Sequence, residues 1–134
     1  MKIIFFYLLV LNICQSDDLP EIIKNFQNNN HLILIFSTDN KSSDYEQTLL
    51  ELARDPLGLD NRDLMIFEIF QRGGMDPDGS PLTEEEVKNL RKFYAIHPDK
   101  FTLVIVNKNM TEVFRSDVPV SAQKIFNVID QTRN

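Results

Sequence analysis

The hydrophobic positions of the chain fall into short apolar runs that are separated by longer, mixed segments. Residues 32–36 (LILIF) are apolar at every position and residues 101–106 (FTLVIV) nearly so, which is typical of strands covered on both faces of a sheet. Residues 64–70 (LMIFEIF) form a third run of this kind. The turn NKNM at 107–110 then leads into TEVFR at 111–115, which completes a β-hairpin. The pattern therefore predicts four strands.

Between these runs, hydrophobic residues recur every three or four positions, which is the spacing of amphipathic helices. The segments with this spacing are residues 19–27, a helix from Ser43, a helix from Thr83 and a last helix that opens at Pro119 and Ser121. Ser43 and Thr83 are each followed three residues later by a glutamate, Glu46 and Glu86. This spacing predicts a capping box at the start of both helices.

Proline and glycine separate the elements. Pro56 and Gly58 are expected to end the helix from Ser43, and residues 71–82, with three Gly and two Pro, are expected to form a loop. The order is then a helix followed by β-α-β-α-β-β-α. A helical crossover makes the first two strands parallel, and a hairpin makes the last two antiparallel. The sequence therefore predicts an α/β domain of thioredoxin-like fold, a four-stranded mixed sheet with helices on both faces.

The first 16 residues differ from the rest. Lys2 is a short positive region, residues 3–11 are continuously apolar, and Cys14-Gln15-Ser16 places small residues three and one before a cut after Ser16. This is the layout of a cleaved secretory signal. The apolar run is shorter than the roughly 20 residues of a membrane-spanning helix. We expect a signal peptide at 1–16, a single domain at 17–134, a secreted or periplasmic location and no transmembrane segment after cleavage.

Cys14 is the only cysteine in the chain. Cleavage after Ser16 leaves a domain with neither a disulfide nor a thiol, so its core alone holds it together. The alternative is a lipoprotein anchored at Cys14, although Ile13 before it is larger than a lipoprotein cleavage box favours.

Composition argues against one class of partner. The chain is 43% hydrophobic, as in ordinary globular proteins, and its net charge is −6 with a pI near 4.8. The basic residues form no polybasic run, whereas a nucleic-acid surface needs clustered Lys and Arg. We expect no nucleic-acid partner.

Several segments resemble a known family: HLILIFSTDN with YEQTLLELA after it, LDNRDLMIFEIF, and FTLVIVNKNMTEVFRSD followed by IFNVID. Over roughly residues 30–132 the chain is similar to the domain of unknown function 4174 (DUF4174), a thioredoxin-like and more narrowly peroxiredoxin-like family. The resemblance implies a small secreted bacterial domain or a repeated domain of animal matrix and sushi-repeat proteins, and it implies no established activity. NKNM stands where the family usually has Lys-Asp-Gly, so no role of that Asp is carried over.

The loop after the first strand is where a redox thioredoxin carries two cysteines separated by two residues, and the helix N-terminus there lowers the thiol pKa. Here the stretch is Lys41-Ser42-Ser43-Asp44, and a peroxidatic cysteine three residues after Thr38 would fall on Lys41. The cis-proline position before the third strand holds Lys100 or Phe101, with Pro98 two or three residues early. We expect neither disulfide reductase nor peroxidase activity.

The serines of this loop have two interpretations. Ser42 or Ser43 acts as a nucleophile if His97 is the base and Asp99 or Glu68 orients it. Alternatively, Ser43 caps a helix and His97 is a solvated loop residue. We assign no catalytic residue.

A binding surface is the preferred use of the loop. We expect it to contain Thr38, Lys41, Ser42 and His97, with Lys108 and Arg115 of the hairpin as further candidates. No cofactor and no metal ligand are assigned.

Two acidic features remain. Asp76, Asp78 and Glu85 lie in a stretch that looks like a calcium loop, but Gly74 occupies the first ligand position, so a turn followed by a capped helix is preferred. Glu68 is the one charge in its apolar strand, and we expect an ion pair with Arg72 or Lys108 if it is buried.

These observations favour a secreted, cysteine-free, noncatalytic thioredoxin-like module that binds an unknown protein or envelope component. The alternatives are an enzyme of unknown reaction at the loop after the first strand, and a weak calcium-dependent structural module.

Overall fold

The computed structural model describes residues 19–132, so the predicted signal peptide, Cys14 and the start of the domain at Asp17 lie outside the described residues. The elements run in the order α2 (Glu21–Lys24), β1 (His31–Phe36), α3 (Ser43–Ala53), α4 (Pro56–Asn61), β2 (Leu64–Ile69), β3 (Gly74–Met75), α5 (Glu84–Phe93), β4 (Thr102–Val106), β5 (Glu112–Ser116) and α6 (Ala122–Thr132). Of the helices within these residues, none is both long and apolar enough to cross a membrane.

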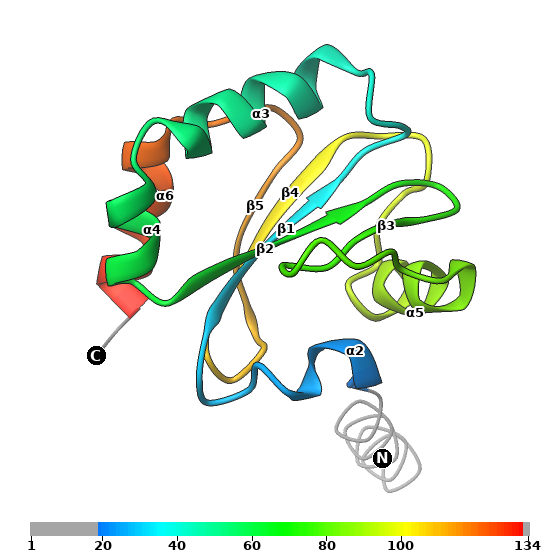
Figure 1. The fold of residues 1–134 in the computed structure, drawn as a ribbon, viewed down its shortest axis with the longest axis horizontal. Coiled ribbons are helices and arrows are strands. Elements are labelled where there is room, and N and C mark those ends of the chain that lie inside the picture. Colours follow the sequence, from blue (N-terminus) through cyan, green and yellow to red (C-terminus); the bar gives the residue numbers. More distant parts are fainter. Residues whose placement is uncertain (1–18, 133–134) are drawn as a thin grey trace, which may run out of the picture.

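One mixed sheet of five strands forms the centre of the domain, in the order β3-β2-β1-β4-β5 (Figure 1). β1 and β2 are parallel, and the β4–β5 hairpin is antiparallel, as predicted. The predicted count of four strands is wrong, because β3 forms inside the loop expected at 71–82. Its two residues, Gly74 and Met75, pair with the end of β2 and are too few to produce a hydrophobic alternation.

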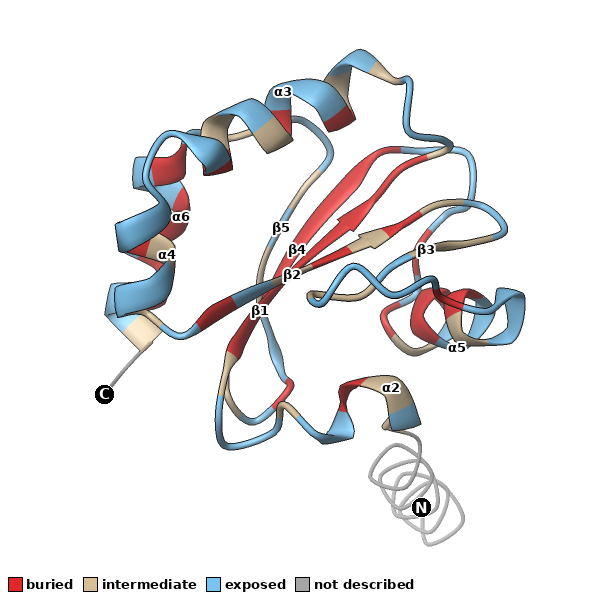
Figure 2. Ribbon diagram, viewed as in Figure 1, coloured by how far each residue is buried: buried red, intermediate tan, exposed pale blue. Residues whose placement is uncertain are grey.

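The sheet separates two hydrophobic layers, as the uninterrupted apolar runs require. One layer lies between the sheet and α2 and α5, around Phe36 and Phe67. The other lies between the sheet and α3 and α6, around Ile33 and Ile125. Every residue of β1 and β4 is buried, which Figure 2 shows as two red central strands.

Side-chain hydrogen bonds cap the N-termini of α3 and α5, and the prediction of Ser43 as the cap of α3 is wrong. Thr83 and Glu86 form the predicted capping box of α5. The cap of α3 is Ser42 rather than Ser43, and its hydroxyl accepts the amide of Tyr45. Adjacent serines are equally good caps, so local sequence does not distinguish them.

Pro56 does not merely end a helix, as predicted, but starts the next one. It occupies the first turn of α4, where its missing N–H leaves no bond unmade. The Asp55 carboxylate caps this turn through the amide of Gly58 at 2.9 Å. The expected helix at 19–27 is also shorter, since α2 covers only Glu21–Lys24.

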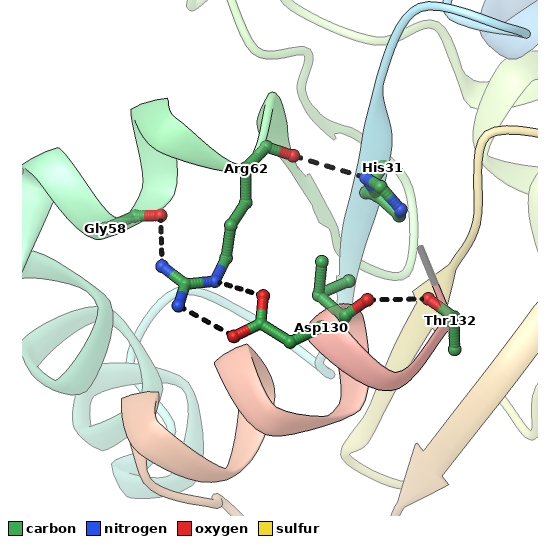
Figure 3. A network of polar contacts seen from close by, with 6 residues as sticks. His31, Gly58, Arg62, Asp130 and Thr132 are labelled. Carbon is green, nitrogen blue, oxygen red and sulfur yellow. Dashed lines mark hydrogen bonds and ion pairs between the residues drawn. The ribbon is translucent and has the colours of Figure 1, made fainter. Parts of the chain in front are cut away.

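Arg62, just after α4, fastens the end of the domain where β1 begins (Figure 3). Its Nε and Nη2 donate to the Asp130 carboxylate at 2.9 and 3.0 Å, and its Nη1 donates to the Gly58 carbonyl at 3.0 Å. The guanidinium lies 4.2 Å from the centroid of the Phe126 ring. The Asp130 hydrogen bond raises the pKa of Arg62, so the cation is permanent. These contacts join α4 to α6 at this end of the sheet. The predicted site lies at the opposite end.

Candidate functional site

The loop that follows β1 is closed by its own hydrogen bonds. Ser37 is buried, and its hydroxyl lies 2.9 Å from the Ser42 hydroxyl and donates to the Asp39 carbonyl at 2.9 Å. Ser42 in turn accepts the Tyr45 amide at 3.2 Å. The Lys41 amide donates to the Asp39 carboxylate at 2.8 Å. These hydrogen bonds therefore fix the conformation of the loop and cap the N-terminus of α3.

Three loop ends meet at this end of the sheet (Figure 1). The pairing of Phe36 with Thr102 brings the loop after β1 beside the segment before β4. Gln71, after β2, donates its side-chain amide to the Pro98 carbonyl and the Asp99 carboxylate, both at 3.1 Å. Loops held together on a rigid sheet are common binding surfaces.

The interpretation of Ser42 or Ser43 as a nucleophile gains no geometric support. The Asp99 amide donates to Nδ1 of His97 at 3.1 Å, while the Asp99 carboxylate accepts from Gln71. Among the hydrogen bonds of the described residues, none joins His97 to Ser42 or Ser43. A nucleophilic serine needs a base within hydrogen-bond reach.

The predicted candidates do not form one site. Thr38, Lys41 and Ser42 lie in the loop after β1, and the exposed His97 lies at the same end of the sheet. Lys108 lies beyond the end of β4, at the opposite end, where its ammonium pairs with Asp63 at 3.1 Å.

Arg115 lies on β5 and fastens the end of α5. It donates to the carbonyls of Tyr94 and Ala95, which follow the helix, and its Nη2 pairs with the Glu112 carboxylate at 2.7 Å. A cation on the last carbonyls of a helix satisfies groups that have no partner within the helix. Arg115 therefore stabilises the end of α5 whether or not a partner is bound.

Arg91, on α5, is a residue of this site that sequence reasoning missed. The residue is 9% exposed, and Nη2 donates at 3.3 Å to the carbonyl of Ser37, the first residue of the loop after β1. Burial lowers the pKa of Arg91, and the charge of Asp99 partly opposes this. The available signal was its position on the apolar stripe of α5, one residue after Leu90 and three before Tyr94.

Glu68 is half-buried, and its partner is a tyrosine rather than the predicted Arg72 or Lys108. The Tyr45 hydroxyl donates to the Glu68 carboxylate from the first turn of α3. Burial raises the pKa of Tyr45, and the hydrogen bond and negative charge of Glu68 raise it further. A carboxylate that accepts a hydrogen bond is stabilised without an ion pair.

We expect Tyr45 and Tyr94 to ionise only with unfolding. Burial, followed by the charge of Glu112, raises the pKa of Tyr94, as burial does for Tyr45. Their stabilising contribution is complete below the unfolded tyrosine pKa of about 10 and is lost as the pH rises through the higher folded pKa. Tyrosinate absorbance of the wild type, Tyr45→Phe and Tyr94→Phe checks this by difference. Ionisation of either residue near pH 10 in the folded protein would contradict it.

Residues 76–80, just after β3, form a turn. The Asp76 carboxylate accepts the amides of Asp78 and Ser80, both at 2.9 Å. Within residues 19–132, no three His, Cys, Asp or Glu side chains are grouped so as to hold a metal ion. The calcium interpretation therefore has no assembled ligand set in its favour.

Solved structures with a similar fold are peroxiredoxins. The reduced 2-Cys peroxiredoxin of Plasmodium vivax matches with a TM-score of 0.60 and 13% identity, over 81% of this chain and 80% of that one. AhpC of Mycobacterium bovis matches with a TM-score of 0.58 and 11% identity, over 83% and 77%. At these identities the likeness shows the thioredoxin-like fold alone. A comparison with curated proteins finds no match.

The sequence model of one protein family, described as domain of unknown function (DUF4174), matches residues 22–133. This span includes every strand and every described helix except the first residue of α2. The chain therefore belongs to the DUF4174 family, on a thioredoxin-like fold.

Proposed function

We propose that this protein is a noncatalytic thioredoxin-like binding module, secreted or periplasmic, whose partner is a protein or an envelope component. The observation that carries the proposal is the hydrogen-bonded group of Ser37, Ser42 and the Tyr45 amide at the start of α3. Where a redox thioredoxin carries its two cysteines, the chain has Lys41 and Asp44, and the Ser42 hydroxyl between them caps the helix.

The contact surface we propose is the end of the sheet at residues 37–42 and 97–99. The first amides of α3 carry partial positive charge, and the exposed Lys41 and His97 add donors. Asp39 has its carboxylate engaged by the Lys41 amide. This combination favours a polar or acidic group on the partner.

We propose that the protein is exported, and the sequence of residues 1–16 is the only support for this. The intact mass of the protein recovered outside the cytoplasm tests it, with a chain that begins at Asp17 as the expected result. A lipid-modified chain that begins at Cys14 would replace this with the anchored form.

Partner binding is tested by cross-linking in the native host, followed by retention of the identified partner on Thr38→Ala, Lys41→Ala and His97→Ala. We expect each of these three changes to weaken retention while the melting temperature stays constant. Lys108→Ala, at the far end of the sheet, is the matched control. Unchanged retention in the three loop variants, with loss in Lys108→Ala at an unchanged melting temperature, would move the site to the hairpin.

The absence of thiol chemistry is tested on the full chain carrying Cys14→Ser, which has no sulfur nucleophile left. We expect insulin reduction and peroxide consumption to equal those of buffer. Turnover by this variant would contradict the noncatalytic proposal.

A further inference from the structure

A groove lies beside α5, at the end of the sheet that holds the loop after β1. Its lining includes Gln71, Glu84, Lys88, Arg91, Lys92 and His97. Because Arg91 also reaches the Ser37 carbonyl, the groove is joined to the proposed contact surface through a single side chain.

Arg91 is nine-tenths buried with most of its hydrogen-bonding capacity unused. An arginine has five N–H donors, and the one hydrogen bond of the Arg91 side chain within residues 19–132 runs from Nη2 to the Ser37 carbonyl at 3.3 Å. Its Nε and Nη1 have no partner among the described residues. The guanidinium carbon lies 5.7 Å from the centroid of the Phe36 ring, which offers no acceptor atom. Buried donors are normally paired, so this site lacks an acceptor.

Charge around the groove favours an anion of low charge. Lys88, Arg91 and Lys92 outnumber Glu84 among the lining residues, and both lysines are exposed at the rim. Asp99 lies close enough to act on the charge of Arg91. Glu84 and Asp99 repel a doubly charged phosphate more strongly than a singly charged carboxylate.

We propose that this groove binds a carboxylate, which accepts hydrogen bonds from the guanidinium of Arg91. The inference rests on the proposed function and names the chemical group of the partner that the site recognises. Nε and Nη1 are covered in this structure, so binding includes a small movement of the side chains around the groove. Arginine suits the task because its planar fork matches the two oxygens of a carboxylate.

The test is a titration of the full-length, ¹⁵N-labelled protein with sodium acetate, against sodium chloride at the same ionic strength. We expect a saturable shift of the Arg91 Nε–H resonance and of the Ser37 and His97 amides with acetate only. Arg91→Lys keeps the charge and removes the fork, and it should weaken acetate binding about tenfold or more. Arg54→Lys changes an exposed arginine at the C-terminal cap of α3; it is the matched control and should leave the affinity unchanged.

Several results would overturn the inference: equal shifts with chloride, unchanged affinity in Arg91→Lys, or saturation with phosphate but not with acetate. If Arg91→Lys does not fold, the double variant Lys88→Ala with Lys92→Ala decides. A several-fold loss of acetate affinity supports the groove, and no loss refutes it. The proposed function fails separately, when the loop variants retain the partner although acetate still shifts Arg91.

Discussion

Replacing Phe67 by alanine should lower the free energy of unfolding by about 3–5 kcal/mol, the usual cost of removing a buried aromatic ring. Phe67 lies on β2, is fully buried, and meets the Phe26 ring edge to face with the centroids 5.5 Å apart. Phe26 follows α2, which has only four residues and depends on tertiary packing. The cavity left by Phe67 therefore removes both core volume and the contact that holds this segment on the sheet.

Urea unfolding measures the effect as a lower midpoint with an unchanged m-value. Met65→Ala is the matched control, because Met65 lies on the same strand and, two residues earlier, on the same face, yet it is 38% exposed. We expect the control to cost clearly less than Phe67→Ala, since its side chain is smaller and partly faces water already. Similar losses in the two variants would contradict the packing described for this layer.

The long apolar runs predict the strands and the covering of the sheet correctly. Leu34 on β1 and Val104 on β4 pair with each other and are buried because helices cover both faces of the sheet. A run without polar positions has no face to present to water, so both the strands and the layers around them follow from the pattern. The Thr83–Glu86 box was equally predictable, because both of its bonds are local.

The elements that were missed depend on distant contacts. β3 exists because Gly74 meets Ile69 across the sheet, not because of its own two residues. The start of α4 at Pro56 depends on the Asp55 cap, and a Pro–Gly pair is as typical of a helix end as of a new first turn. Local propensity cannot separate such cases.

The sequence predicts which loops meet at one end of the sheet, but not which buried side chains lie beneath them. The loop after β1 and His97 were identified because the fold brings strand ends together. Arg91 was missed because a cation on a predominantly apolar helix face is normally read as surface, and its burial under Ser37 is a tertiary fact. Arg115 is predicted as a binding residue, yet it donates to the carbonyls of Tyr94 and Ala95, which only the three-dimensional fold brings within its reach.

Gly74→Ala adds one methyl group and should lower the free energy of unfolding by about 1–3 kcal/mol, the usual cost of overpacking a tightly packed site. A Cβ at Gly74 would lie 2.0 Å from the backbone carbonyl oxygen of Glu68, an atom that no side-chain rotation can move. Gly74→Ala therefore requires β3 to separate from the end of β2.

The neighbouring glycine supplies the control for this prediction. A Cβ at Gly73 meets only the Leu82 carbonyl oxygen, at 3.8 Å, so Gly73→Ala should be neutral or slightly stabilising through the unfolded chain. Displacement of β3 also shifts the turn that holds Gln71 on Pro98 and Asp99, so Gly74→Ala should weaken partner retention as well as stability. Urea midpoints and retention of the two variants, measured side by side, check both effects. Equal stability of Gly74→Ala and Gly73→Ala would mean that β3 does not approach β2 as closely as described.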